Sequence, residues 1–379
     1  MRELHDLAEV DAHLAEHGEL CDVVVQGVDL SSRSMQILQA GCVGATFLGC
    51  NLRGAALEHV IDGGAAVFPD LPDLPFQPYR SRLYRQHELL RGWSPDDPAS
   101  SFDDALDSVI YRWSRHQGHG RNPTVLDALA RRLHDHAIDD ALAEHLAERD
   151  EVVAVMGGHS MRRTDDGFAL VAELGRAMAR EGWHVATGGG PGAMEAANLG
   201  AWLSPYDDGA LDRALELLAD EVDFGRPQPY LRAGQRVLDE FPDGAESLAV
   251  PTWFYGHEPT NQFATHVAKY FDNSIREDGL LAISTRGVVF SPGAAGTLQE
   301  VFQDATQNHY AVYGNVSPMV FLGRAFWTEE LPAEPLLRTL AGDRAYADLI
   351  GVADTADEAM VFLREHPMLD LGADGPGSG

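Results

Sequence analysis

The sequence is short of positive charge. Among its 379 residues there is one lysine, Lys269, and the formal net charge is -31. Nucleic acids and anionic membranes bind clustered cations, so we expect neither as a partner. Because no G-x-x-x-x-G-K-[ST] segment is present, a P-loop NTPase is excluded. A pyridoxal-phosphate enzyme would need Lys269 as its Schiff-base residue, and the helical pattern around it is not the usual setting.

The sequence also has few cysteines and shows no recognisable secretory-signal or metal-binding pattern. Cys21, Cys42 and Cys50 are the only cysteines, and no C-x-x-C pair occurs. An odd number of thiols fits a reducing compartment. The first residues lack the apolar core of a secretory signal, and no run approaches the ~18 apolar residues of a membrane span. We therefore expect a cytoplasmic protein. His134 and His136 lie in an amphipathic helical pattern and are expected to be solvated, so we predict no metal and no cofactor.

The chain divides into four predicted parts. Residues 1–100 form an accessory region with a five-residue period over residues 40–57, followed by an extended linker rich in proline, arginine and aromatics. The period either marks the inward positions of a short pentapeptide-like coil or is accidental. Residues 101–150 are a helical connection, residues 151–366 the main domain, and residues 367–379 a disordered tail.

The main domain alternates short apolar runs with helical patterns. This alternation predicts an α/β fold with a doubly wound parallel sheet, Rossmann-like in type. The expected strands are residues 152–156, 183–187, 247–250, 287–290, 318–322 and 349–353. The expected helices are residues 168–181, 193–203, 262–276 and 355–365.

Two glycine-rich turns each follow an expected strand and open a helix. The first runs from Gly188 to Gly192 and the second from Gly293 to Thr297. The free N–H groups of a helix N-terminus bind anions, so the pair predicts a phosphate-bearing ligand. The first turn also fits a G-x-G-x-x-A dinucleotide fingerprint, but it lies on the second strand of its unit. A βα connection without ligand stays open for that turn, and a capping-box role with Thr297 stays open for Glu300.

The residues around both turns resemble the Lonely Guy family, phosphoribohydrolases that cleave nucleoside 5′-monophosphates. Residues 188–201 read GGGPGAMEAANLGA, which matches the first motif of some branches of that family in full. Residues 292–300 read PGAAGTLQE, where the family has PGGxGTxxE, so Ala294 replaces a glycine. Glu277 stands where a lysine usually follows the family's arginine. The resemblance covers about residues 150–365.

The resemblance implies a site and a reaction. Glu300 and Arg276 correspond to the catalytic pair, with Arg276 holding the carboxylate ionised. Glu195 is either a second acid facing the ribose or a charge at a helix start. The implied phosphate- and nucleotide-binding residues are Gly188, Gly189, Gly190, Gly192, Met194, Glu195, Gly293, Ala294, Ala295, Gly296 and Thr297.

The implied activity is hydrolysis of the N-glycosidic bond of a nucleoside 5′-monophosphate, either AMP-like or a cytokinin riboside monophosphate. The products are the free base and ribose 5-phosphate. A homodimer or larger homo-oligomer is implied as well. The alternative is a non-catalytic nucleotide-binding protein or one like the molybdenum-cofactor carriers, which are sister families of this fold. A dinucleotide oxidoreductase is a third, weaker hypothesis.

Overall fold

The computed structural model describes residues 2–97, 99–116 and 124–372, and it divides the chain into two compact units. The first unit comprises residues 1–83 and 112–145. The second comprises residues 84–111 and 146–379. The second unit contains both glycine turns, so it holds the predicted site.

The first unit is built on a parallel sheet of four short strands in the order β1-β2-β3-β4. Val25 and Phe47 lie side by side on neighbouring strands, and neither is exposed. Such stacked apolar positions give the unit a core of its own. The strands are β1 (Arg2–Leu4), β2 (Val23–Gln26), β3 (Thr46–Leu48) and β4 (Ala66–Phe68). Its helices include α1 (Leu7–His17), α2 (Ser34–Ile37), α3 (Ala55–Asp62) and most of α6 (Val125–Leu146).

The stretch with the five-residue period lies in this sheet layer. Its period coincides with buried positions as far as Leu52, after which Ala55 is exposed at the start of α3. The buried positions are Ala40, Cys42, Ala45, Phe47, Cys50 and Leu52. In this stretch the chain forms one strand of the sheet and then a helix. The period therefore follows the inward-facing side chains of a βα layer.

The prediction that His134 is solvated is wrong. Its side chain is fully buried in α6, where Nδ1 lies 3.2 Å from Oδ1 of Asp135. Burial lowers the pKa of His134, because a charged imidazole loses its hydration there. His136, two residues on, is exposed as predicted. Helical spacing placed both histidines on a helix but did not distinguish its buried side from its exposed side.

The second unit contains a seven-stranded sheet in the order β12-β11-β9-β5-β6-β7-β8, and all neighbours are parallel. The predicted α/β fold with a doubly wound parallel sheet is confirmed. The central strands are fully buried, as expected when helices cover both faces. The strands are β5 (Val152–Met156), β6 (His184–Thr187), β7 (Leu248–Ala249), β8 (His266–Val267), β9 (Gly287–Phe290), β11 (Met319–Leu322) and β12 (Ile350–Ala353).

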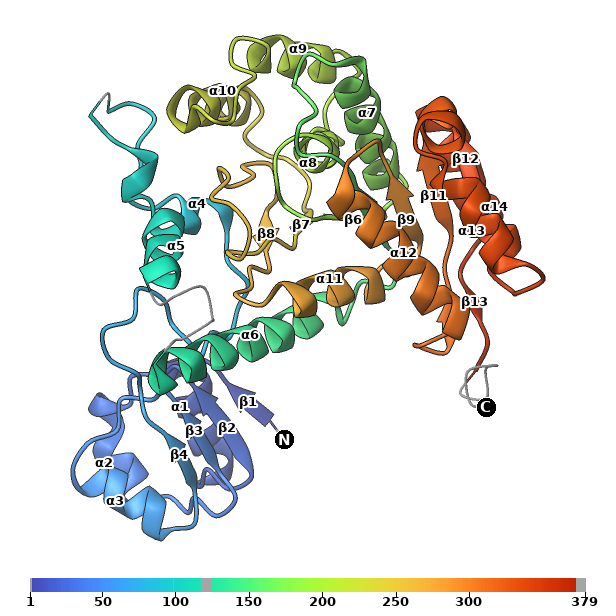
Figure 1. Cartoon of the computed structure of the whole chain (residues 1–379). Coiled ribbons are helices and arrows are strands. Elements are labelled where there is room, and N and C mark those ends of the chain that lie inside the picture. The colour runs from blue at the N-terminus through green and yellow to red at the C-terminus, as the bar shows by residue number, and fades with distance from the viewer. Residues whose placement is uncertain (1, 98, 117–123, 373–379) are drawn as a thin grey trace. The chain divides into compact units, whose positions relative to one another are not determined.

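Two groups of helices accompany this sheet (Figure 1). Helices α7 (Asp166–Arg180), α8 (Ala193–Trp202) and α14 (Ala356–Glu365) form one group, with α7 packed on both others. Helices α11 (Asn273–Ala282), α12 (Ala295–Tyr310) and α13 (Ala333–Ala341) form the other. Right-handed crossovers place helices on opposite faces when the strand order reverses direction. The unit also contains α4 (Gln86–Leu89), α5 (Leu106–His116, of which residues 112–116 belong to the first unit), α9 (Gly209–Leu218) and α10 (Pro227–Glu240).

The expected helix over residues 262–276 is wrong. This segment contains β8, and α11 begins only at Asn273. Every residue from 261 to 271 is buried, so the segment has no exposed face. Periodicity cannot distinguish a strand from a helix in a fully buried run, because the alternation of exposed and buried positions is missing.

The strand order reverses beside β5. From β5 the chain moves through β6 and β7 to β8, and it then returns to β9, on the other side of β5. In open parallel sheets such a reversal leaves a crevice outside the carboxyl ends of the strands. Both glycine turns follow the strands at this point, the first after β6 and the second after β9.

Near its end the described chain forms a short strand. Residues 369–370 form β13 (Leu369–Asp370), which pairs antiparallel with β10 (Asn315–Val316). Residues 373–379 of the predicted tail lie outside the described residues.

In the part of the chain that the structure describes, no helix is both long and apolar enough to cross a membrane.

Edge strand β8 supplies a testable pH dependence. Burial lowers the pKa of His266 to about 4, although Glu246 nearby favours its charged form. The unfolded chain therefore binds a proton below about pH 6.5 that the folded chain does not bind. The free energy of unfolding should fall as the pH drops from 6.5 to 4. We expect His266→Gln to remove up to about 1.4 kcal/mol per pH unit of this dependence.

Urea unfolding at a series of pH values measures this contribution. The same substitution at the exposed His87 is the control, and it should keep the wild-type slope. An unchanged slope in His266→Gln would show that His266 does not carry the effect.

Candidate functional site

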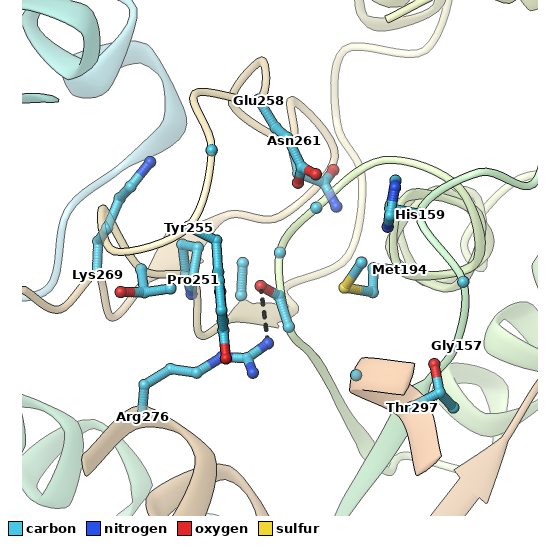
Figure 2. A pocket seen from close by; sticks show the side chains of 18 of the residues that line it. Gly157, His159, Met194, Pro251, Tyr255, Glu258, Asn261, Lys269, Arg276 and Thr297 are labelled. Atoms are coloured by element: carbon cyan, nitrogen blue, oxygen red, sulfur yellow. Dashed lines mark hydrogen bonds between the residues drawn. The ribbon is translucent and has the colours of Figure 1, made fainter. Parts of the chain in front are cut away.

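A cavity of about 510 Å³ opens at the carboxyl ends of the central strands (Figure 2). The turns after β5, β6 and β9 line it, together with the segment after β7 and the first turns of α12. All of its lining residues belong to the second unit. Its volume is within the ~300–1,000 Å³ common for small-molecule sites.

Most of the predicted site residues meet in this cavity. Those that line it are Gly188, Gly189, Gly190, Met194, Arg276, Ala294, Ala295, Gly296, Thr297 and Glu300. Three predicted residues do not line it: Gly192, Glu195 and Gly293. The two glycine turns, about a hundred residues apart in sequence, thus form walls of one cavity.

Arg276 and Glu300 form an ion pair inside the cavity. Nη1 of Arg276 lies 3.2 Å from Oε1 of Glu300, and the two side chains are 9% and 13% exposed. Arg276 Nε also donates to the carbonyl of Val250, at 2.7 Å. The arginine on α11 is therefore anchored to the end of β7 and holds the carboxylate of α12 in a fixed orientation.

Burial and Arg276 have opposite effects on the pKa of Glu300. Burial raises the pKa of Glu300, and the neighbouring Glu277 raises it further. Arg276 lowers that pKa but does not offset burial, so the net shift is upward from 4.5. Arg276 thus favours the ionised carboxylate, as predicted, but its effect on the pKa is smaller than that of burial. A carboxyl group with a raised pKa is better suited to exchange protons near neutral pH.

The N-terminus of α12 faces the same cavity. Its first backbone bond runs from the Leu298 N–H to the Ala294 carbonyl, so the N–H groups of residues 295–297 precede the helical ladder. Thr297 is the third residue of the helix and Ala294 is its N-cap. Glu300 is therefore not a capping-box partner of Thr297. Ala294 has φ -109°, which any residue adopts, so alanine fits this turn without backbone strain.

Two glycines of the first turn are required by close approach. A Cβ atom at Gly188 would collide with Nη2 of Arg276. Gly192 has φ +73°, and a Cβ atom there would collide with the carbonyl of Gly158. Gly188 therefore makes room for the ion pair, whereas Gly192 allows α8 to begin against the turn after β5.

Glu195 pairs with a buried arginine. Its carboxylate accepts from Arg163 Nη2 at 2.5 Å and Nε at 3.1 Å, and from the hydroxyl of Tyr230 at 2.5 Å. Glu195 and Arg163 are both buried, and the guanidinium also lies over the ring of Tyr230. With its oxygens engaged and no place in the cavity wall, Glu195 acts as a structural charge.

Sequence reasoning missed a second buried ion pair beside the cavity. Lys269 lines the wall, and its Nζ lies 2.8 Å from Oδ1 of Asp107. Asp107 also accepts from Trp253 Nε1 at 2.7 Å and from Thr260 Oγ1 at 2.8 Å. Burial would raise the pKa of Asp107, but Lys269 and the hydrogen bonds outweigh it and the pKa is lowered. The one sequence signal for Lys269 was that it is the only lysine of the chain. Nothing in the sequence linked it to Asp107.

Sequence reasoning also assigned no role to Glu258, Tyr255 and His159, which line the cavity (Figure 2). Residues 257–261 read HEPTN, which loosely resembles the E-Q-x-P-N loop of the Lonely Guy family, and that resemblance was the available sequence signal for Glu258. Among the described residues, one group of acidic and histidine side chains is close enough to hold a metal ion: Glu3, His5 and Glu144. That group lies in the first unit and lines no part of the cavity.

Comparison with known proteins adds a partial family match. The sequence model of the SLOG cluster4 family matches residues 150–204, which include the first glycine turn. No curated protein matches the sequence significantly. A molybdenum cofactor binding protein from Rippkaea orientalis has a similar structure, with 16% identity, a TM-score of 0.37, and coverage of 57% of this chain and 97% of that one. The molybdenum cofactor carrier protein of Chlamydomonas reinhardtii is similar at 19% identity and a TM-score of 0.36, covering 57% of this chain and 98% of its own.

Proposed function

We propose that this protein hydrolyses the N-glycosidic bond of a nucleoside 5′-monophosphate of the AMP or cytokinin riboside monophosphate type. The observation that carries the proposal is the Arg276–Glu300 ion pair inside a cavity that also contains a helix N-terminus. A carboxylate beside the sugar and an anion site for the phosphate are the two groups this reaction needs. The residues that resemble the Lonely Guy motifs supply both.

In this scheme the phosphate binds the N–H groups of residues 295–297, and Thr297 contributes its hydroxyl. Glu300 lies next to the ribose and takes a proton from the attacking water, while its charge stabilises the oxocarbenium-like transition state. The C1′–N bond breaks and its electron pair stays on the base nitrogen, while the hydroxide left from the water bonds to C1′. The base leaves with one proton, equal to the one that Glu300 took from the water, so that Glu300 returns to its carboxylate form. Arg276 orients Glu300 throughout. The scheme requires no metal.

Free base released from a panel of nucleoside monophosphates tests the proposal directly. The panel holds AMP, GMP, CMP, UMP and IMP, with the matching nucleosides as controls that lack the phosphate. We expect release from at least one monophosphate and much slower release from its nucleoside. If every monophosphate stays intact, the hydrolase assignment fails.

A second candidate is a non-catalytic protein that carries a nucleotide or the molybdenum cofactor. The observation that favours it is Glu277, which stands in place of the family's lysine and raises the pKa of Glu300. The same panel separates the two, because a carrier binds a nucleotide and leaves it intact.

The homo-oligomer stays a prediction from the resemblance. Light scattering coupled to size-exclusion chromatography should give at least twice the 41.2 kDa mass of one chain. A monomer at micromolar concentration would contradict it.

A further inference from the structure

The loop over residues 257–261 is fixed on both sides of Glu258. The ring of His257 stacks between Phe102 and Tyr111, with centroid distances of 4.8 and 4.6 Å. On the other side, the hydroxyl of Thr260 donates to the buried Asp107 at 2.8 Å. A loop held in this way presents the side chain between its anchors in one place.

Asn261 fixes the same loop through two hydrogen bonds of its side chain. Its Nδ2 donates to Oδ1 of Asn198 at 2.9 Å, and its own Oδ1 accepts from the N–H of Phe263 at 3.0 Å. Asn198 in turn accepts from the hydroxyl of Thr187, at the end of β6, at 2.7 Å. Buried and satisfied amides of this kind fix the loop against the first glycine turn.

Glu258 itself is not engaged. In the described part of the chain, no hydrogen bond or ion pair involves its carboxylate, although the side chain is half-buried and lines the cavity. Its Oε2 lies against the first glycine turn, 2.8 Å from the place a Cβ atom of Gly190 would take. Burial raises the pKa of Glu258, while His159, Lys269 and Arg276 oppose the rise. A carboxylate that lines the cavity and has no partner in the described protein is available to accept from a donor that a ligand supplies.

The position of Glu258 indicates which part of a bound nucleotide would lie next to its carboxylate. Given the proposed function, the phosphate lies at residues 295–297 and the sugar at Glu300. Arg276 reaches Gly188, whereas Glu258 reaches Gly190, two residues further along the same turn. Figure 2 shows Glu258 on the wall opposite Arg276 and away from Thr297. The base is the remaining part of the nucleotide, and Glu258 lines a wall that neither the phosphate nor the sugar occupies in this scheme.

We propose that Glu258 selects a nucleotide whose base carries an exocyclic amino group. This inference rests on the proposed binding of a nucleotide, not on its cleavage. A carboxylate only accepts hydrogen bonds, and an exocyclic amine offers two N–H donors and no acceptor. An oxo group in the same place sets one acceptor against another. The ring N–H of hypoxanthine or uracil lies beside such an oxo group, so a carboxylate placed at the exocyclic position meets the acceptor oxygen first.

Binding in the Glu300→Gln background tests this, because a ligand that is not cleaved gives a dissociation constant. The probes are two matched pairs that differ in amino against oxo at one position, AMP with IMP and CMP with UMP. We expect the amino member of each pair to bind at least about tenfold more tightly. Adding Glu258→Gln should reduce that ratio to within about threefold, since an amide both donates and accepts.

Ribose 5-phosphate, which lacks a base, is the control ligand. Its affinity should be the same with and without Glu258→Gln, which also reports that the variant is folded. An amino-to-oxo ratio that Glu258→Gln leaves unchanged would overturn the inference, and so would the absence of binding by all four nucleotides. A change in the ratio of AMP to 2′-deoxy-AMP instead would place Glu258 at the sugar and overturn it too. Failure of cleavage by the wild type bears on the proposed function alone.

Discussion

Glu300→Gln should reduce the release of base from the best monophosphate by about 10³-fold or more, with little change in nucleotide affinity. The amide keeps the shape of the side chain but neither takes a proton from water nor carries the negative charge that the transition state needs. It can still accept a hydrogen bond from Arg276, so the arginine keeps its position. Rates of base release and the dissociation constant of the same nucleotide measure the two effects separately.

Glu330→Gln, the same change at an exposed position, is the matched control and should keep full activity. The wild-type pH profile is a second readout. Because the pKa of Glu300 is raised, activity that needs its carboxylate should fall with decreasing pH through a midpoint above 4.5. Base release by Glu300→Gln within tenfold of the wild type would remove Glu300 from the mechanism.

The strands and turns that place the site were predictable, because the sequence marks each strand by an apolar run and by the turn residues that end it. The run over residues 152–156 and the run over residues 287–290 are β-branched or apolar and end in turn residues, and both are strands with those bounds. The first glycine turn follows β6 and opens α8, as its pattern indicates. Parallel strands share one carboxyl edge, so two such turns were bound to approach each other.

The interactions that set the roles of single residues were not predictable. Glu195 had two open roles, and the deciding partner, Arg163, is 32 residues away with no motif to connect them. Burial in the folded protein, not the helix pattern, sets the pKa of Glu300. Glu258 stands out only because its neighbours on both sides are bonded and it is not. Each of these facts depends on which side chains three-dimensional packing brings together, and one sequence does not contain it.

The Asp107–Lys269 ion pair is the largest stability effect we expect. Asp107 is not exposed at all, and Lys269 is 6% exposed. Lys269→Met would leave a buried carboxylate without its counter-charge, and Asp107→Asn would leave a buried ammonium. Removal of one partner of a buried pair costs about 3–5 kcal/mol. We expect each single substitution to lower the free energy of unfolding by that amount, as measured by urea denaturation.

The double variant Asp107→Asn with Lys269→Met separates the charge effect from packing. Asparagine retains an oxygen that accepts from Trp253 or Thr260, and methionine fills the volume of the lysine stem without a charge. No buried charge is then left unpaired, so the double variant should lose less than the sum of the two single losses by at least about 2 kcal/mol. Asp104→Asn, at an exposed position three residues before Asp107, is the control and should be neutral. Additive losses in the double variant would mean that the two residues contribute through their packing, and that the wall of the cavity beside Lys269 does not depend on the ion pair.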